Sequence, residues 1–172
     1  LKTEDFETLT FTSPHDFLRQ YTLGQAGCII LDIQMPGVTG LELQDTLNDI
    51  GATLPIIFIT GHGDVPAAVQ AMKNGAFEFM QKPFSDKTLL GYIREALVLD
   101  EKNRSQLAAK HSILSRIETL SPREKQVMHQ VSIGKANKVI ARELGLSPRT
   151  VEIYRSHVLL KMQVNSTIEL VN

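Results

Sequence analysis

Three side chains of complementary chemistry each close a short apolar run: Asp32, Thr60 and Lys82. Continuous apolar runs bounded by glycine and proline predict strands that are buried on both faces of a parallel sheet. Because the carboxyl ends of such strands meet at one edge, we expect these side chains to lie together. A carboxylate beside a hydroxyl and an ammonium group can accept a phosphoryl group and hold it. An aspartate that only caps the following turn is the alternative that position alone leaves open.

The elements that must position these side chains alternate between strand and helix along residues 1–98. Runs rich in β-branched and aromatic residues predict strands, and serines such as Ser13 and Ser85 predict helix starts. The predicted strands are 7–12 on the outside, then 28–32, 55–60 and 77–81, and the predicted helices are 14–21, 40–48, 66–73 and one that follows Ser85. This alternation predicts an α/β fold with a doubly wound parallel sheet.

Three motifs of this region resemble the receiver domain of bacterial two-component response regulators. They are Asp32 to Pro36 with Gly40, Thr60 to Asp64, and Lys82 to Phe84. The resemblance implies a flavodoxin-like fold in which a partner histidine kinase phosphorylates Asp32. It also implies that Mg²⁺ is bound by Asp32 and by the backbone carbonyl of Gln34.

The resemblance assigns further roles at the same edge of the sheet. Lys82 would pair with one phosphoryl oxygen, Thr60 would donate a hydrogen bond to another, and Phe79 would move inward after Thr60. We expect this repacking to change the surface around the helix at 66–73 and the strand at 77–81, where a homodimer would form on phosphorylation. The Lys82–Pro83 peptide bond is expected to be cis.

One part of the receiver pattern has no match in this chain. Receivers of this pattern begin with a central strand followed by two acidic residues that bind Mg²⁺ together with the acceptor aspartate. Glu4 and Asp5 precede the outer strand and do not match, so we expect an N-terminally truncated receiver at 1–98, without its first strand and most of its first helix. The metal site would lack two carboxylates, and strand 7–12 would pair directly with strand 28–32 or leave both edges open.

The two halves of the 172-residue chain differ in charge. Residues 1–98 hold 6 Lys and Arg against 12 Asp and Glu, a net charge of −6, whereas residues 99–172 hold 12 against 7, a net charge of +5. A basic half favours a nucleic-acid partner. No apolar stretch is long enough for a membrane span, and the single cysteine, Cys28, fits a reducing cytoplasm. The five histidines lack the spacing of a zinc site.

Residues 99–118 are predicted to form a helical linker that extends the preceding helix, with a dimer seam as the less favoured interpretation of its apolar positions. An all-α domain at 119–172 follows, and Ser121 with Glu124 forms a capping box at its start. The helices expected there are 122–133, 137–144 and 148–162, with Asn137 as the cap of the second. Capped helices joined by a short glycine-containing turn are typical of a helix-turn-helix.

The third helix of this domain has one apolar and one polar face. Counting about 100° per residue, Val151, Val158 and Met162 fall on the core side, whereas Ile153 falls outward among polar residues. Such a face suits the major groove of double-stranded DNA, and an ordinary solvated face is the alternative. The stretches 120–124, 137–141, 144–147 and 149–152 resemble the LuxR-type DNA-binding domain, and the two domains together resemble the FixJ group of regulators. The residues predicted to contact DNA are Lys138, Arg149, Thr150, Glu152, Ile153, Arg155, Ser156 and Lys161.

These features predict a two-component response regulator that acts as a DNA-binding transcription factor in the cytoplasm, with RNA polymerase as a further partner. A regulator that binds DNA independently of phosphorylation, with a degenerate or missing metal site, is the alternative. An aspartate-dependent phosphohydrolase is disfavoured, because such enzymes need a second aspartate where this chain has Gln34. No enzymatic activity is therefore expected.

Overall fold

The chain forms two compact units, Leu1–Gln106 and Leu107–Asn172. The computed structural model describes residues 6–61 and 65–171. Helix α4 (Asp86–Glu118) contributes residues to both units. Among the described residues, no helix has both the length and the apolar character that crossing a membrane requires.

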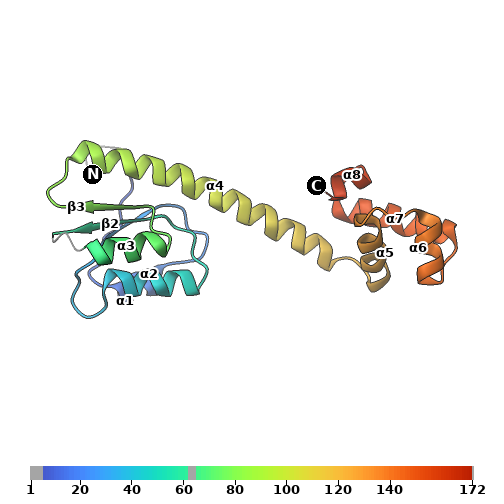
Figure 1. Ribbon diagram of the computed structural model, residues 1–172, viewed down its shortest axis with the longest axis horizontal. Coiled ribbons are helices and arrows are strands. Elements are labelled where there is room, and N and C mark those ends of the chain that lie inside the picture. Colours follow the sequence, from blue (N-terminus) through green and yellow to red (C-terminus); the bar gives the residue numbers. More distant parts are fainter. Residues whose placement is uncertain (1–5, 62–64, 172) are drawn as a thin grey trace. The chain divides into compact units, whose positions relative to one another are not determined.

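The first unit is built on a parallel sheet with the strand order β1-β2-β3 (Figure 1). Its strands are β1 (Ile29–Asp32), β2 (Ile56–Thr60) and β3 (Glu78–Gln81). One face is covered by α1 (Pro14–Gln20), α2 (Gly40–Asp49) and α3 (Val65–Lys73), and the other by the first part of α4. A helix follows each strand and all strands run parallel, so the predicted doubly wound α/β fold is confirmed.

Side chains alternate between the two faces of this sheet, as strand geometry requires. Leu31 and Phe58 belong to the apolar cluster shared with α2 and α3, whereas Ile57 and Met80 belong to the cluster shared with α4. Ile57 and Phe58 are neighbours in β2, and both are fully buried. Strand β2 is therefore the centre of the unit, buried on both faces and paired with a strand on each side.

Residues 7–12 do not form the predicted outer strand. The structure has no strand in this segment, and the described partner of β1 is β2. Phe6 packs against the cluster between the sheet and α4, and Phe11 meets Phe17 of α1 edge to face, with ring centroids 5.3 Å apart. Leu9, between these two anchors, is exposed. Residues 7–12 are therefore an irregular segment that Phe6 and Phe11 attach to the unit, and their alternation does not indicate a strand.

Helices α1, α2 and α4 begin with caps that satisfy free backbone N–H groups. The hydroxyl of Ser13 accepts a hydrogen bond at the start of α1, and that of Ser85 accepts one from the backbone of Thr88 at the start of α4. Both caps were predicted. Thr39 and Glu42 form a full capping box at the start of α2, which was not predicted.

Helix α4 is unbroken over its 33 residues, so the predicted helical extension is confirmed. Within the first unit a buried polar contact adds to its apolar packing. The carboxylate of Asp100 accepts hydrogen bonds from the backbone N–H of Gly27 at 3.0 Å and from Nε of Arg104 at 2.7 Å. This contact fastens α4 to the loop that enters β1.

The second unit contains the end of α4 and the remaining helices of the chain. They are α5 (Pro122–Ser132), α6 (Asn137–Leu144), α7 (Pro148–Met162) and α8 (Thr167–Val171). Val127, Ile140 and Val151, from α5, α6 and α7, are buried together and form the core. The predicted helix-turn-helix is confirmed. Gly145 ends α6 with a φ of 66°, a left-handed conformation that favours glycine.

Asn137 is not the cap of α6, contrary to the prediction. Ala136 occupies the cap position without a side-chain hydrogen bond, and Asn137 is the first residue of the helix. The Oδ1 atom of Asn137 instead accepts a hydrogen bond from Nη1 of Arg155 on α7, at 2.8 Å. Its side chain therefore joins α6 to α7.

Candidate functional site

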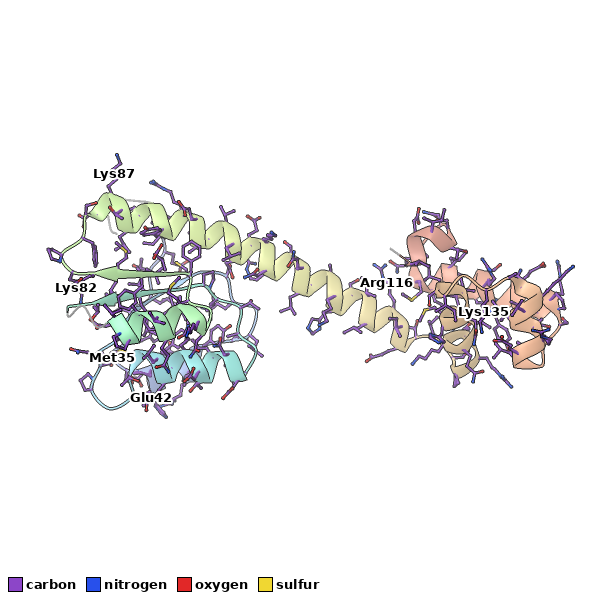
Figure 2. All side chains as sticks on the ribbon, viewed as in Figure 1. Met35, Glu42, Lys82, Lys87, Arg116 and Lys135 are labelled. Carbon is purple, nitrogen blue, oxygen red and sulfur yellow. The ribbon has the colours of Figure 1, made fainter. Side chains whose placement is uncertain are left out.

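Asp32 and Lys82 form the centre of a polar site at the carboxyl edge of the sheet. Asp32 ends β1, Lys82 follows β3, and Nζ of Lys82 lies 2.9 Å from Oδ2 of Asp32. The backbone N–H of Gln34 donates to Oδ1 of the same carboxylate at 3.0 Å. Lys82 lies at the same end of the first unit as Met35, which belongs to the loop after β1 (Figure 2). Both carboxylate oxygens accept a hydrogen bond, yet 33% of the Asp32 side chain is exposed to solvent and accessible to a small reagent.

Thr60 lies between these residues, at the carboxyl end of β2. The residue is buried, and its backbone oxygen accepts a hydrogen bond from the backbone N–H of Lys82 at 2.8 Å. The pairing of β2 with both neighbouring strands thus brings Asp32, Thr60 and Lys82 to one edge. That is the juxtaposition expected from parallel strands.

Phe79 pairs with Phe58 across β3 and β2 and packs, half-buried, against the cluster beneath α2 and α3. The Lys82–Pro83 peptide bond is cis, as predicted. Three motif residues, 62–64, and the acidic residues 4 and 5 lie outside the described part of the chain.

The electrostatics of the site keep Asp32 ionised. Burial raises the pKa of its carboxyl, but the hydrogen bonds from Lys82 and from the backbone of Gln34 outweigh burial and hold the pKa below its ordinary value of 3.8. An ionised carboxylate is the nucleophilic form. The Lys82 ammonium group can also pair with an anionic group bound next to Asp32.

The start of α2 approaches the backbone of Asp32 closely. The N–H of Gly40 donates to the carbonyl of Ile33 at 3.0 Å. A Cβ at position 40 would overlap the carbonyl oxygen of Asp32 and lie 3.0 Å from a ring carbon of Phe58. Only glycine fits there without a shift of one of these groups. Gly40 therefore helps to place Asp32, a role that the sequence motif alone did not explain.

A second candidate site lies on α7 of the second unit. The core side contains Val151, Val158 and Met162, all buried as predicted. The outward residues are Arg149, Glu152, Ile153, Ser156 and Leu160, all exposed as predicted. Their exposure leaves this face available to a partner.

Four other predicted contact residues flank this face. Lys138 of α6 is exposed, and Thr150 of α7 shares a hydrogen bond with Ser147 at 2.8 Å. Arg155 and Lys161 have partners inside the domain. The Nη1 and Nη2 atoms of Arg155 donate to Asn137 and Thr167 at 2.8 and 2.7 Å, and Nζ of Lys161 lies 2.7 Å from Oε2 of Glu124.

Comparisons with known proteins agree with this organisation. Residues 1–94 match the family model of the response regulator receiver domain, and residues 118–172 match that of the bacterial regulatory proteins of the luxR family. The chain belongs to the response regulators.

Individual response regulators show the same relationship along most of the chain. The transcriptional regulatory protein FixJ of Bradyrhizobium diazoefficiens is 47% identical over 145 residues, which cover 84% of this chain and 71% of FixJ. The response regulator protein TodT of Pseudomonas putida is 44% identical over 161 residues, covering 94% of this chain and 71% of TodT. The solved structure of the response regulator StyR matches with a TM-score of 0.86 and 39% identity, covering 99% of this chain and 86% of StyR.

Receiver domains of response regulators generally bind Mg²⁺ for phosphorylation. Mg²⁺ requires near-octahedral coordination by oxygen. In the part of the chain that the structure describes, Asp32 and the carbonyl of Gln34 are candidate donors, but no group of three His, Cys, Asp or Glu side chains comes together.

Proposed function

We propose that this response regulator accepts a phosphoryl group on Asp32 from a histidine kinase and binds double-stranded DNA through α7. The observation that carries the first part is the 2.9 Å contact between Lys82 and the ionised, accessible Asp32. In the transfer, a carboxylate oxygen attacks the phosphorus of a phosphohistidine. The bond between phosphorus and the histidine nitrogen breaks, and an aspartyl phosphate forms. Lys82 then pairs with a phosphoryl oxygen.

The transferred phosphoryl group would act through the residues around it. Thr60 donates a hydrogen bond to a phosphoryl oxygen, and Phe79 follows it inward, so that the surface of α3 and β3 changes. Val65, Val69 and Met72 of α3 are exposed, and such apolar side chains suit a homodimer contact. Phosphorylation would therefore favour dimers, and dimers would bind paired DNA half-sites.

On the DNA side, the exposed face of α7 enters the major groove. Glu152, Ile153 and Ser156 meet base edges, while Lys138 and Arg149 contact phosphates. In this proposal the chain consists of a receiver domain at 1–98, a linker at 99–118 and a DNA-binding domain at 119–172. The protein acts in the cytoplasm, without a membrane contact, and affects transcription through its position relative to RNA polymerase.

Fluorescence anisotropy with labelled duplexes at several salt concentrations tests the DNA-binding part. Neutralising a phosphate contact, as in Lys138→Gln or Arg149→Gln, should weaken binding to all sequences and reduce the salt slope by about one unit. Lys87→Gln, on the first unit and equally exposed to solvent, is the control and should leave both quantities unchanged. A chain without salt-dependent binding would contradict the proposal.

A second candidate function is DNA binding that does not depend on phosphorylation. One observation favours it: the described residues do not complete a metal centre around Asp32. The two functions differ in one measurable quantity, the change in DNA affinity after incubation with acetyl phosphate and Mg²⁺. An increase that is absent in Asp32→Asn identifies the phosphorylation-dependent function, and an unchanged affinity identifies the second.

A further inference from the structure

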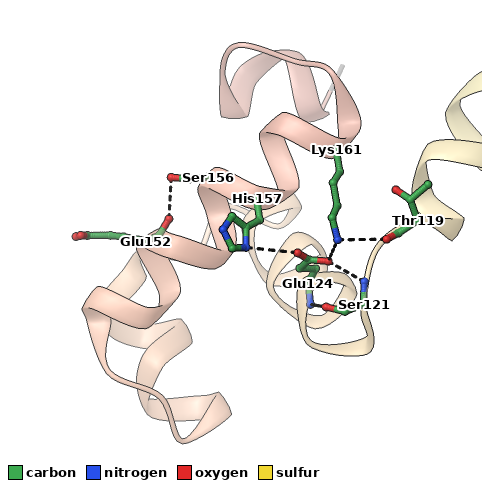
Figure 3. Close-up of polar contacts among 7 residues, drawn as sticks. All are labelled: Thr119, Ser121, Glu124, Glu152, Ser156, His157 and Lys161. Carbon is green, nitrogen blue, oxygen red and sulfur yellow. Dashed lines mark hydrogen bonds and ion pairs between the residues drawn. The ribbon is translucent and has the colours of Figure 1, made fainter.

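The carboxylate of Glu124 is a buried junction between α5 and α7 (Figure 3). It accepts a hydrogen bond from the backbone N–H of Ser121 at 2.7 Å, which completes the capping box of α5. Nζ of Lys161 lies 2.7 Å away, and Nδ1 of His157 lies 3.6 Å away. Lys161 also donates to the carbonyl of Thr119 at 3.3 Å. The carboxylate of Glu124 thus binds Lys161 directly and lies close to His157, both on α7.

The charge of this junction is permanent over the physiological pH range. The hydrogen bond from Lys161, together with that from the backbone of Ser121, outweighs burial and lowers the pKa of Glu124 to about 2. A buried charge requires a partner, since removal of the partner leaves it uncompensated. The geometry of the ion pair therefore constrains where Lys161, and with it α7, can lie.

The junction constrains the rotation of α7 about its own axis. His157 and Lys161 are four residues apart and so lie on one flank of the helix, beside the outward face. Arg155 holds the opposite flank through Asn137 and Thr167. Hydrogen bonds such as those of Lys161 and Arg155 are directional, unlike the apolar contacts of the core side. Polar contacts on both flanks therefore fix the direction in which the outward residues point.

We propose that Glu124 is a positioning residue for DNA recognition, which sets the rotation of α7 through Lys161, and that Lys161 acts inside the domain and not on a DNA phosphate. This inference rests on the proposed function of α7. Readout of base edges needs side chains held to within about 0.5 Å of their contact geometry. Loss of the junction should therefore reduce sequence discrimination more than it reduces non-specific attraction.

The test compares Glu124→Gln and Lys161→Gln with the wild type in the full 172-residue chain. The probes are a duplex that the wild type selects from a randomised library and a scrambled duplex of the same composition. Binding is measured by anisotropy at several salt concentrations, at a temperature where circular dichroism shows each variant folded. Lys135→Gln is the matched control, because it breaks an equally short ion pair, Lys135–Glu143 at 2.6 Å, that does not involve α7.

Both junction variants should lower the ratio of selected to scrambled affinity by about tenfold, the size of one lost base contact. Their salt slopes should equal that of the wild type, and Lys161→Arg, which keeps the charge, should retain most of the ratio. Lys135→Gln should change neither quantity. Lys161→Gln supplies the test alone if Glu124→Gln does not fold, because Lys161 is the more exposed partner.

Two results would overturn the proposal while leaving DNA binding by α7 intact. One is a salt slope reduced by about one unit in Lys161→Gln, which would make Lys161 a phosphate contact. The other is a folded variant with the affinity ratio of the wild type. A wild-type chain that selects no sequence and shows no salt dependence would instead overturn the proposed function, and this inference with it.

Discussion

Lys82 and Asp32 are 50 positions apart in the sequence, yet Nζ of one lies 2.9 Å from Oδ2 of the other. The contact exists because β2 pairs with both strands that carry them, in a register that places Asp32 beside Ile59 and Thr60 beside Gln81. A shift of one residue in either pairing would turn the side chains to the opposite face. The register of the sheet therefore determines the chemistry of its edge.

Removing the ammonium group should raise the pKa of Asp32. In Lys82→Met the desolvation of the carboxyl remains while its strongest hydrogen bond is lost, so the pKa moves upward. The wild-type carboxylate stabilises the fold above its unfolded pKa, and this stabilisation is lost as the pH falls through the lower folded value. A carbon-13 NMR titration of the Asp32 carboxyl measures the shift. Lys87→Met is the control, and an unchanged pKa in Lys82→Met would contradict the electrostatic account.

Asp32→Asn should abolish the formation of an aspartyl phosphate, because an amide oxygen is a poor nucleophile toward phosphorus. The measurement is the intact mass of the chain after incubation with acetyl phosphate and Mg²⁺. Asp49→Asn, an exposed aspartate at the end of α2, serves as the matched control and should leave any adduct in place. An adduct that persists in Asp32→Asn would place the acceptor elsewhere.

Gly40→Ala should destabilise the first unit by about 1–3 kcal/mol, since its Cβ would overlap the carbonyl oxygen of Asp32. The same substitution at Gly91, inside α4, meets no atom within 4 Å and should stabilise the unit by about 0.5–1 kcal/mol. Urea unfolding followed by NMR signals of β1 and β2 measures both. Equal effects of the two substitutions would contradict the close approach at position 40.

The second unit should lose stability in acid as Glu124 titrates. Its folded pKa of about 2 lies below the ordinary 4.5, so the stabilisation is complete above about pH 4.5 and declines as the pH falls toward 2. Glu124→Gln should lower the free energy of unfolding at neutral pH by about 1–3 kcal/mol and remove most of this pH dependence.

Thermal unfolding followed by amide NMR signals of α7 measures that change. Glu143→Gln, which breaks the more exposed ion pair with Lys135, is the matched control variant. It should lower the free energy of unfolding by only about 0–1 kcal/mol. If Glu124→Gln showed the acid profile of the wild type, the stabilisation would have to come from another group.

Much of the fold was predictable because local and long-range signals agree. Strands β1, β2 and β3 are apolar runs that end in turn-forming residues, and α7 begins at Pro148 and ends at Met162 as its periodicity indicates. The capping box of Ser121 and Glu124 needs only residues close in sequence, so it could be identified without the structure. The edge formed by Asp32, Thr60 and Lys82 follows from parallel pairing alone.

The errors concern side chains with more than one plausible partner. Alternation over 7–12 suggests a strand, but two phenylalanines anchor that segment to different clusters. The side chain of Asn137 is of a type that often caps helices, but its Oδ1 atom accepts a hydrogen bond from Arg155 of α7 instead. The ion pair between Lys161 and the buried carboxylate of Glu124, 37 residues away, has no local signal either, whereas the DNA contact of Lys161 stays a prediction. Tertiary contacts determine all three features.

The burial of β2 also has a consequence for the order in which the first unit opens. Amides in a strand that is covered on both faces and paired on both sides exchange with deuterium only when the whole sheet separates. Amides of the irregular segment 7–12 need only a local opening. Since Thr60 ends β2, the edge that carries Asp32, Thr60 and Lys82 is attached to the part of the unit expected to exchange most slowly. Its groups would therefore stay assembled through the small fluctuations that expose the outer segments.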